Sequence, residues 1–185
     1  PSNHSIMLFP RILTASAQRK LKIHLKRGGL VAYPTESCYG LGCIPTFPRA
    51  LSRVVSLKKR PQDKGMIVIG SRLEQLQPLL ERPSEKTIFM LEREWPAPKT
   101  FLLPSRAGIL PLLRGKGRNK LAVRVPAHQG ARRLCKVLGT PLVSTSCNRA
   151  GKRPCKTERE VRRQFGRKVG GKRFNRRARK TKSDY

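Results

Sequence analysis

The chain has 185 residues, the size of one ordinary domain, and 37% of them are hydrophobic. The apolar residues form short runs, none near the roughly 20 residues that would cross a bilayer. The first residues also lack the charged-then-apolar order of a signal peptide. We therefore expect one soluble, cytoplasmic domain with a core of its own and no membrane partner.

The charge is strongly unbalanced, with 42 Lys and Arg against 10 Asp and Glu and a formal net charge of +32. The many positive side chains repel one another unless anions bind to the protein. Nucleotides, RNA phosphates and acidic membrane surfaces would each meet that demand, and a merely solvated basic face is a further interpretation. Charge alone therefore predicts a polyanionic partner without choosing one.

The cysteines are five in number and include no C-x-x-C pair. An odd count without paired spacing favours reduced thiols over a disulfide framework or a zinc site. We therefore expect no structural metal.

The first third of the chain has apolar spacing typical of two helices around a strand. Residues 14–27 read as a helix that ends at Gly28, and residues 30–33 as a buried strand that ends at Pro34 with a loop after it. Residues 47–58 read as a second helix. Strand ends are common places for functional side chains.

The middle of the chain continues this alternation. We expect a strand at residues 66–69, helices at 73–80 and 84–94, and a strand at 100–103. The prolines between residues 95 and 98 break the pattern before that strand.

The last third reads as strand, helix, strand and helix, followed by a change of composition. The strands are predicted at residues 121–125 and 141–145, with a helix at 131–138 between them. Thr157 and Glu160 have capping-box spacing and open a helix that runs to about residue 165. Residues 1–166 are therefore expected to form an α/β domain, and residues 167–185 a basic tail that is either a disordered arm or an ordered terminal strand.

The usual signatures of nucleotide and hydrolase sites are missing from the sequence. There is no G-x-x-x-x-G-K-[ST] loop and no G-x-G-x-x-G fingerprint. The three histidines have no Ser or Cys partner at a recognisable triad spacing. An enzyme with this sequence would work mainly by positioning and charge.

Three cations close together are the first candidates for a site. Lys58, Arg60 and Lys64 fall within seven residues beside a predicted strand. Such groups can hold triphosphate oxygens and stabilise charge that grows on a leaving pyrophosphate. Taken alone, the same run is also typical of a solvated helix end.

Two polar segments at strand ends are the other candidates. Ser144, Ser146 and Asn148 offer hydroxyls and an amide where an apolar strand ends, which suits hydrogen bonds to ligand oxygens. Thr35 follows Pro34 at the end of another buried strand. A polar turn without a ligand explains the first segment equally well.

Taken in order, these segments resemble the YrdC/TsaC family of threonylcarbamoyl-AMP synthases. The similarity covers about residues 14–166. It is carried by Ala32-Tyr33-Pro34-Thr35-Glu36 with Tyr39-Gly40-Leu41-Gly42-Cys43, by Leu57-Lys58-Lys59-Arg60-Pro61 with Asp63-Lys64-Gly65, by Trp95-Pro96-x-Pro98-x-Thr100, by Leu121-Ala122-Val123-Arg124-Val125, and by Pro141-Leu142-Val143-Ser144-Thr145-Ser146-x-Asn148.

The resemblance implies a twisted mixed sheet with flanking helices around a basic concave cleft. It implies an enzyme that forms L-threonylcarbamoyladenylate and pyrophosphate from L-threonine, bicarbonate and ATP, with Mg²⁺ accompanying the triphosphate and no protein metal ligand. The product would go to the tRNA threonylcarbamoyl-transferase complex for the t6A modification of tRNA.

The resemblance also implies roles for individual residues. Lys58 and Arg60 would be the catalytic pair that holds the phosphates, and Thr35 and Arg124 would bind threonine, the latter through its carboxylate. The ATP-binding set would be Lys58, Arg60, Lys64, Ser144, Ser146 and Asn148.

The chain departs from the family pattern in three places. Arg149 and Lys99 add positive charge, and the segment after Gly170 keeps little of the family's terminal strand. These departures and the net charge motivate a second hypothesis, a non-catalytic module on the same fold that binds tRNA or double-stranded RNA through its basic surface.

Overall fold

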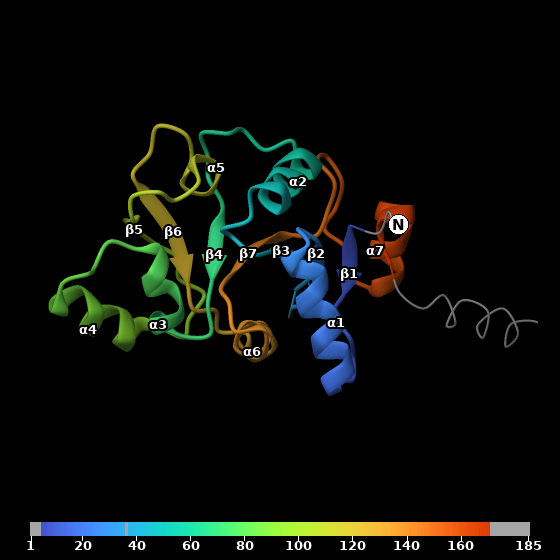
Figure 1. Ribbon diagram of the computed structural model, residues 1–185, viewed down its shortest axis with the longest axis horizontal. Coiled ribbons are helices and arrows are strands. Elements are labelled where there is room, and N and C mark those ends of the chain that lie inside the picture. The colour runs from blue at the N-terminus through green and yellow to red at the C-terminus, as the bar shows by residue number, and fades with distance from the viewer. Residues whose placement is uncertain (1–4, 36, 171–185) are drawn as a thin grey trace, which may run out of the picture.

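The computed structural model describes residues 5–35 and 37–170 (Figure 1). The strands are β1 (Ile6–Leu8), β2 (Leu30–Pro34), β3 (Tyr39–Cys43), β4 (Ile67–Ile69), β5 (Phe101–Pro104), β6 (Lys120–Arg124) and β7 (Leu142–Ser146). The helices are α1 (Ala15–Lys26), α2 (Pro48–Lys58), α3 (Leu73–Leu76), α4 (Glu85–Glu94), α5 (Pro111–Arg114), α6 (Gln129–Leu138) and α7 (Glu158–Phe165), with 3-10 turns η1 (Gln77–Leu79) and η2 (Gly166–Lys168). None of the helices in the described ranges is long and apolar enough to span a membrane.

The strands form one mixed sheet in the order β1-β2-β3-β7-β4-β6-β5. The β1/β2 and β4/β6 pairs are parallel, and the other neighbours are antiparallel. The predicted α/β class with a mixed sheet is therefore confirmed.

Helices cover both faces of the sheet and create two apolar clusters. One cluster joins α1 and α6 to β2, β4 and β7, with Leu21 and Leu134 among its buried residues. The larger cluster joins α2, α5 and α7 to the other face, with Val54 and Val161 among its buried residues. Figure 1 shows α1 and α6 on the opposite side of the sheet from α2.

The strand register aligns Gly42, Ser144, Ile67 and Ala122 in one row, on the same face as α1 and α6. Ser144 pairs with Gly42 of β3 on one side and with Ile67 of β4 on the other, and Ile67 pairs in turn with Ala122 of β6. Because side chains alternate along a strand, Ser144 lies on the same face as the core residue Leu142, two positions earlier. Beyond the cover of α1 and α6, this face forms the floor of the site described below.

All six predicted helices and all five predicted strands are present, with ends shifted by a few residues. Three elements were not predicted: β1, β3 and α5. The predicted loop directly after Pro34 is present, and the missed strand β3 follows it, so that β2 and β3 form an antiparallel hairpin in which Pro34 pairs with Tyr39. Glycines weaken the strand signal of β3. One of them is required by packing, since a Cβ on Gly42 would lie 2.7 Å from the carbonyl oxygen of Val143.

The chain remains packed on the domain through Gly170. Val169 is buried, and the amide of Gly170 donates to the carbonyl oxygen of Ile6 at 2.9 Å. Val169 and Gly170, which belong to the predicted basic tail, therefore contact the edge strand β1. The remainder of that tail, 171–185, lies outside the described residues.

Candidate active site

A pocket of about 290 Å³ opens on the uncovered part of the sheet, where β7 ends and β4 begins. We call it the site pocket. Its lining residues are Thr35, Cys38, Tyr39, Gly40, Arg60, Met66, Ile67, Arg124, Ser144, Thr145 and Ser146. Five of the eight predicted site residues, from four separate segments of the chain, therefore line one pocket.

Lys58 lies behind this pocket and holds the loop that ends β7. Its ammonium donates to the carbonyl oxygen of Ser146 at 3.0 Å, to Ser146 Oγ at 3.1 Å and to Asn148 Oδ1 at 2.6 Å. All three of its donor hydrogens can therefore be used within the protein. Partial burial lowers the pKa of Lys58 below its usual range.

Asn148 links Lys58 to the segment that follows the loop. The residue is 9% exposed, and its amide nitrogen donates to the carbonyl oxygens of Arg149 and Lys152, both at 3.0 Å. Its oxygen also accepts from Ser146 Oγ at 2.7 Å. The carboxamide thus fixes the loop conformation from both ends.

The backbone separates Lys58 from Arg60. Lys59, the C-cap of α2, has a left-handed conformation with φ of 43°, which is uncommon for a residue with a side chain. The turn leaves Lys58 on the helix and sends Arg60 toward the sheet. Arg60 Nε donates to the carbonyl oxygen of Gly65 at 2.6 Å, which leaves the terminal nitrogens of the guanidinium for a ligand.

Lys64, the third predicted phosphate ligand, is exposed and does not line the site pocket. It lines a neighbouring pocket with residues of α5 and β6. The two pockets share Met66, so Lys64 lies close to the site without being part of its wall.

Arg124 crosses the floor of the site pocket from the end of β6. Its Nε donates to Thr100 Oγ1 at 2.8 Å, which fixes the plane of the guanidinium. The two terminal nitrogens are the pair that can grip a carboxylate in a bidentate way. Sequence reasoning noted Thr100 in a motif but assigned no role to it.

Ser144 is oriented from below by Tyr33, whose hydroxyl forms a short hydrogen bond with Ser144 Oγ. Tyr33 is 2% exposed, and its burial raises the pKa of the phenol well above the usual range. The phenol therefore stays neutral and can donate a hydrogen bond at any ordinary pH.

Thr35 lies at the turn between β2 and β3. Its hydroxyl donates to the carbonyl oxygen of Cys38 and accepts from the amide of Cys38 at 3.3 Å. Cys38 is half-buried, and it was not predicted as a site residue. Only recognition of the β2/β3 hairpin could have placed it beside Thr35.

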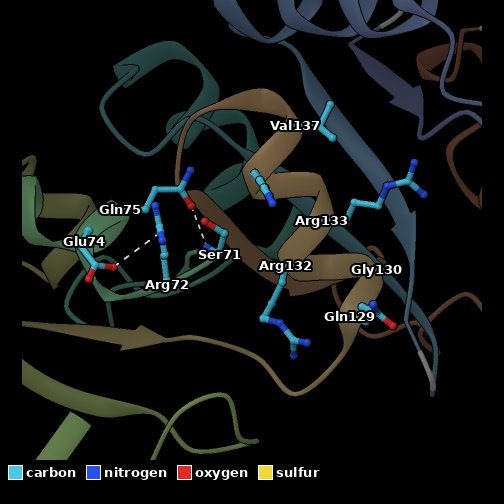
Figure 2. A pocket seen from close by; sticks show the side chains of 10 residues that line it. Ser71, Arg72, Glu74, Gln75, Gln129, Gly130, Arg132, Arg133 and Val137 are labelled. Carbon is cyan, nitrogen blue, oxygen red and sulfur yellow. Dashed lines mark hydrogen bonds and ion pairs between the residues drawn. The ribbon is translucent and has the colours of Figure 1, made fainter. Parts of the chain in front are cut away.

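A much larger groove, of about 1330 Å³, lies between α3 and α6. Figure 2 shows Ser71, Arg72, Glu74 and Gln75 on one side of it and residues of α6, including Arg132, on the other. Arg132 is held by two backbone carbonyl oxygens, each 2.8 Å away. None of the predicted site residues lines this groove, so its size does not make it the candidate site.

No group of three or more His, Cys, Asp or Glu side chains within the described ranges could hold a metal ion. Among the residues that the structure describes, none that lines the site pocket is a carboxylate. All five cysteines are free, and every one except Cys38 is buried. The described residues therefore do not fit a resident metal centre.

The model of the Sua5–YciO–YrdC family, described as "Telomere recombination", matches residues 24–173, more than half of the chain. The chain belongs to this family. A curated relative from Neisseria gonorrhoeae named threonylcarbamoyl-AMP synthase is 74% identical over 163 residues, which are 88% of this chain and 86% of the relative.

Solved structures agree with the family assignment. Sua5 of P. abyssi, in a crystal structure described as complexed with L-threonine, is 30% identical with a TM-score of 0.74. The match covers 90% of this chain and 50% of Sua5, so this chain spans about half the length of that protein. E. coli YciO, 22% identical with a TM-score of 0.71 over 90% of this chain and 84% of its own, shares the fold.

Proposed function

We propose that this protein is a threonylcarbamoyl-AMP synthase that converts L-threonine, bicarbonate and ATP into L-threonylcarbamoyladenylate and pyrophosphate. The observation that supports it most is the convergence of two cations, Arg60 and Arg124, with the hydroxyls of Ser144 and Ser146 in one pocket. The 74% identity to a curated synthase supports the same activity.

The reaction needs positioning and charge more than acid–base groups. The amine of threonine and bicarbonate give a carbamate with loss of one water molecule, and an oxygen of the carbamate attacks the α-phosphorus of ATP. The bond from that phosphorus to the oxygen bridging to the β-phosphate breaks, and its electron pair leaves with pyrophosphate. Fixed cations next to the developing charge are the usual means of stabilising such a transition state.

The arrangement suggests how the residues share this work. Arg60 would contact the phosphates directly, because its terminal nitrogens are free toward the pocket. Ser144 and Ser146 would hydrogen-bond the nucleotide, on a loop that Lys58 and Asn148 hold in place. Lys58 would reach a phosphate only by exchanging one of its three present acceptors.

Threonine would bind at the opposite end of the pocket. Arg124 would grip the carboxylate in the plane that Thr100 sets, and Thr35 would contact the amino acid from the hairpin turn. The bicarbonate carbon would then lie between threonine and the α-phosphate.

Magnesium would arrive with ATP as part of the substrate. Mg²⁺ prefers oxygen ligands and is often held mainly by substrate phosphates and water. The described lining residues of the pocket, which include no carboxylate, fit that arrangement.

The product would be passed to the tRNA threonylcarbamoyl-transferase complex, and the protein would then work in the cytoplasm beside tRNA. A net charge of +32 favours contact with the tRNA backbone through the basic surface. No observation of the described residues favours the second hypothesis, a non-catalytic RNA-binding module, over the enzyme.

Incubation of the purified protein with ATP, L-threonine and bicarbonate tests the proposal directly. We expect mass spectrometry to detect threonylcarbamoyl-adenylate, and pyrophosphate release to require both threonine and bicarbonate. Arg60→Ala should lower the rate roughly 10- to 1000-fold, as loss of a transition-state charge contact does. Release of pyrophosphate that ignores threonine would contradict the assignment.

A further inference from the structure

A second, more enclosed pocket of about 350 Å³ adjoins the site pocket. We call it the cationic pocket, because its described lining residues include four basic side chains and no acidic one. These are Lys64, Arg114, Arg118 and Lys120. Only Lys64 belongs to the ATP-binding set predicted from the sequence, and the reaction described above gives the other three no role.

Two loops joined backbone to backbone build this pocket. The amide of Met66 donates to the carbonyl oxygen of Leu113, and the amide of Lys116 donates to that of Gln62, both at 2.9 Å. Gly115, with φ of 92°, allows the closest approach, since a Cβ there would lie 2.5 Å from the carbonyl oxygen of Asp63. The loops that carry Lys64 and Arg118 are therefore held at a fixed separation.

Arg114 carries an unsatisfied donor in this pocket. Its Nη1 is shielded from solvent and has no hydrogen-bond partner among the described residues. The four ion pairs found within residues 5–35 and 37–170 all lie elsewhere and include none of the pocket's cations. Buried guanidinium nitrogens without a partner are costly, and four unpaired cations repel one another. An anion in the pocket would relieve both costs.

The cationic pocket adjoins the site pocket on the same face of the sheet. Met66 lines both, and Arg60 of the site pocket donates to the carbonyl oxygen of Gly65, which lines the cationic pocket. On the floor, Ile67 of one pocket pairs in register with Ala122 of the other. A chain of phosphates bound at Arg60 would therefore have the cationic pocket beside it.

We infer that the cationic pocket binds the β- and γ-phosphates of ATP and retains the leaving pyrophosphate, with Arg114 and Arg118 as phosphate ligands beside Lys64. This inference rests on the proposed function, because it assigns the leaving-group end of the same substrate. When the bond to the α-phosphorus breaks, its electron pair and the new negative charge move onto pyrophosphate. The unpaired cations lie where they would stabilise that charge.

Arg118→Met provides the test, with Lys116→Met as its control. Arg118 is exposed, so its loss should leave the fold intact, and thermal unfolding checks this. Lys116 belongs to the same loop and is exposed, but it does not line the pocket. Both variants lose one positive charge, so the comparison separates a phosphate contact from the general field of the protein.

Calorimetric titrations with ATP, AMP and pyrophosphate give the readout. Because a charge-assisted contact is lost in Arg118→Met, the affinities for ATP and for pyrophosphate should fall about 10- to 100-fold. AMP affinity in that variant, and all three affinities in Lys116→Met, should stay within about twofold of wild type. Equal weakening of AMP and pyrophosphate, no weakening at all, or an effect confined to RNA binding would overturn the inference.

The outcome is separable from that of the proposed function. If the wild type forms threonylcarbamoyl-adenylate while Arg118→Met keeps its pyrophosphate affinity, the enzyme stands and the subsite is wrong. If pyrophosphate binding depends on Arg118 but no product forms with threonine and bicarbonate, the pocket binds pyrophosphate and the assigned reaction is wrong.

Discussion

The ammonium of Lys58 lies 2.6 Å from Oδ1 of Asn148, which joins the end of α2 to the loop after β7 across 90 residues of sequence. The same ammonium contacts Ser146 twice. The Lys-x-Arg and Ser-x-Asn segments are therefore one physical unit, in which Lys58 sets the loop and Arg60 faces the pocket.

Replacement of Lys58 by Met tests whether Lys58 fixes the conformation of the loop after β7. Removing the ammonium leaves three oxygens without their shared donor, so we expect the synthase rate to fall roughly 10- to 1000-fold. The free energy of unfolding should also fall, by about 1–3 kcal/mol, because partly buried acceptors lose their partner. Product formation and urea unfolding measure the two effects.

Lys20→Met is the matched control for charge, since Lys20 is exposed on α1, far from the loop in the sequence. The Lys20→Met variant should keep the synthase rate and the free energy of unfolding of the wild type. A Lys58→Met protein with wild-type turnover would refute the role of Lys58 in the site.

Arg124 and Thr100 allow threonine binding to be dissected. In Arg124→Lys the bidentate grip is lost, so the KM for threonine should rise about 10- to 100-fold while the KM for ATP stays nearly constant. Thr100→Val removes only the hydrogen bond that sets the guanidinium plane, and a smaller rise of about 2- to 10-fold is expected. Parallel rises for both substrates would show that Arg124 acts on the pocket as a whole.

The sequence singled out five residues that line the site pocket, but it missed two of the strands in the sheet around them. Lys58, Arg60 and Ser144 were found because each follows a strongly periodic element, and their motifs sit in a recognisable order. The hairpin partner β3 was missed because its glycines, needed for close strand approach, resemble a loop in one dimension.

Side-chain orientation was beyond the sequence altogether. Lys58 and Arg60 look equivalent as a motif, yet the left-handed turn at Lys59 sends them to different places. The unsatisfied guanidinium of Arg114 depends on two loops that meet only in the folded chain. Neither relationship changes the hydrophobic periodicity or the composition of the sequence, so neither could be predicted from it.

Cys38 should report ligand binding as a chemical probe. It lines the site pocket and is half-buried, whereas the other four cysteines are buried. Burial raises the pKa of Cys43 and of Cys135 to about 12, which keeps these thiols protonated and unreactive. Iodoacetamide should therefore alkylate Cys38 first, and ATP with threonine should slow that alkylation.

Peptide mass spectrometry over a time course measures this order. Alkylation of Cys147 before Cys38 would mean that the loop after β7 opens more readily than the structure indicates. An alkylation rate that ignores saturating substrates would place the ligands outside the site pocket.

His24 should make the fold sensitive to mild acid. Its ring Nε2 lies 2.7 Å from the carbonyl oxygen of Leu30, and burial lowers its pKa below the usual 6.5, outweighing the backbone hydrogen bonds that raise it. Between the folded and unfolded pKa values the unfolded chain binds more protons, so stability falls as the pH drops below about 6.5 and levels off below the folded pKa. A neutral amide in place of His24 does not take up a proton in this pH range, so it adds no pH dependence to the stability. Urea unfolding of wild type and His24→Gln at a series of pH values from about 7.5 to 5 should therefore show a steeper loss in the wild type, and parallel curves would contradict the role of His24.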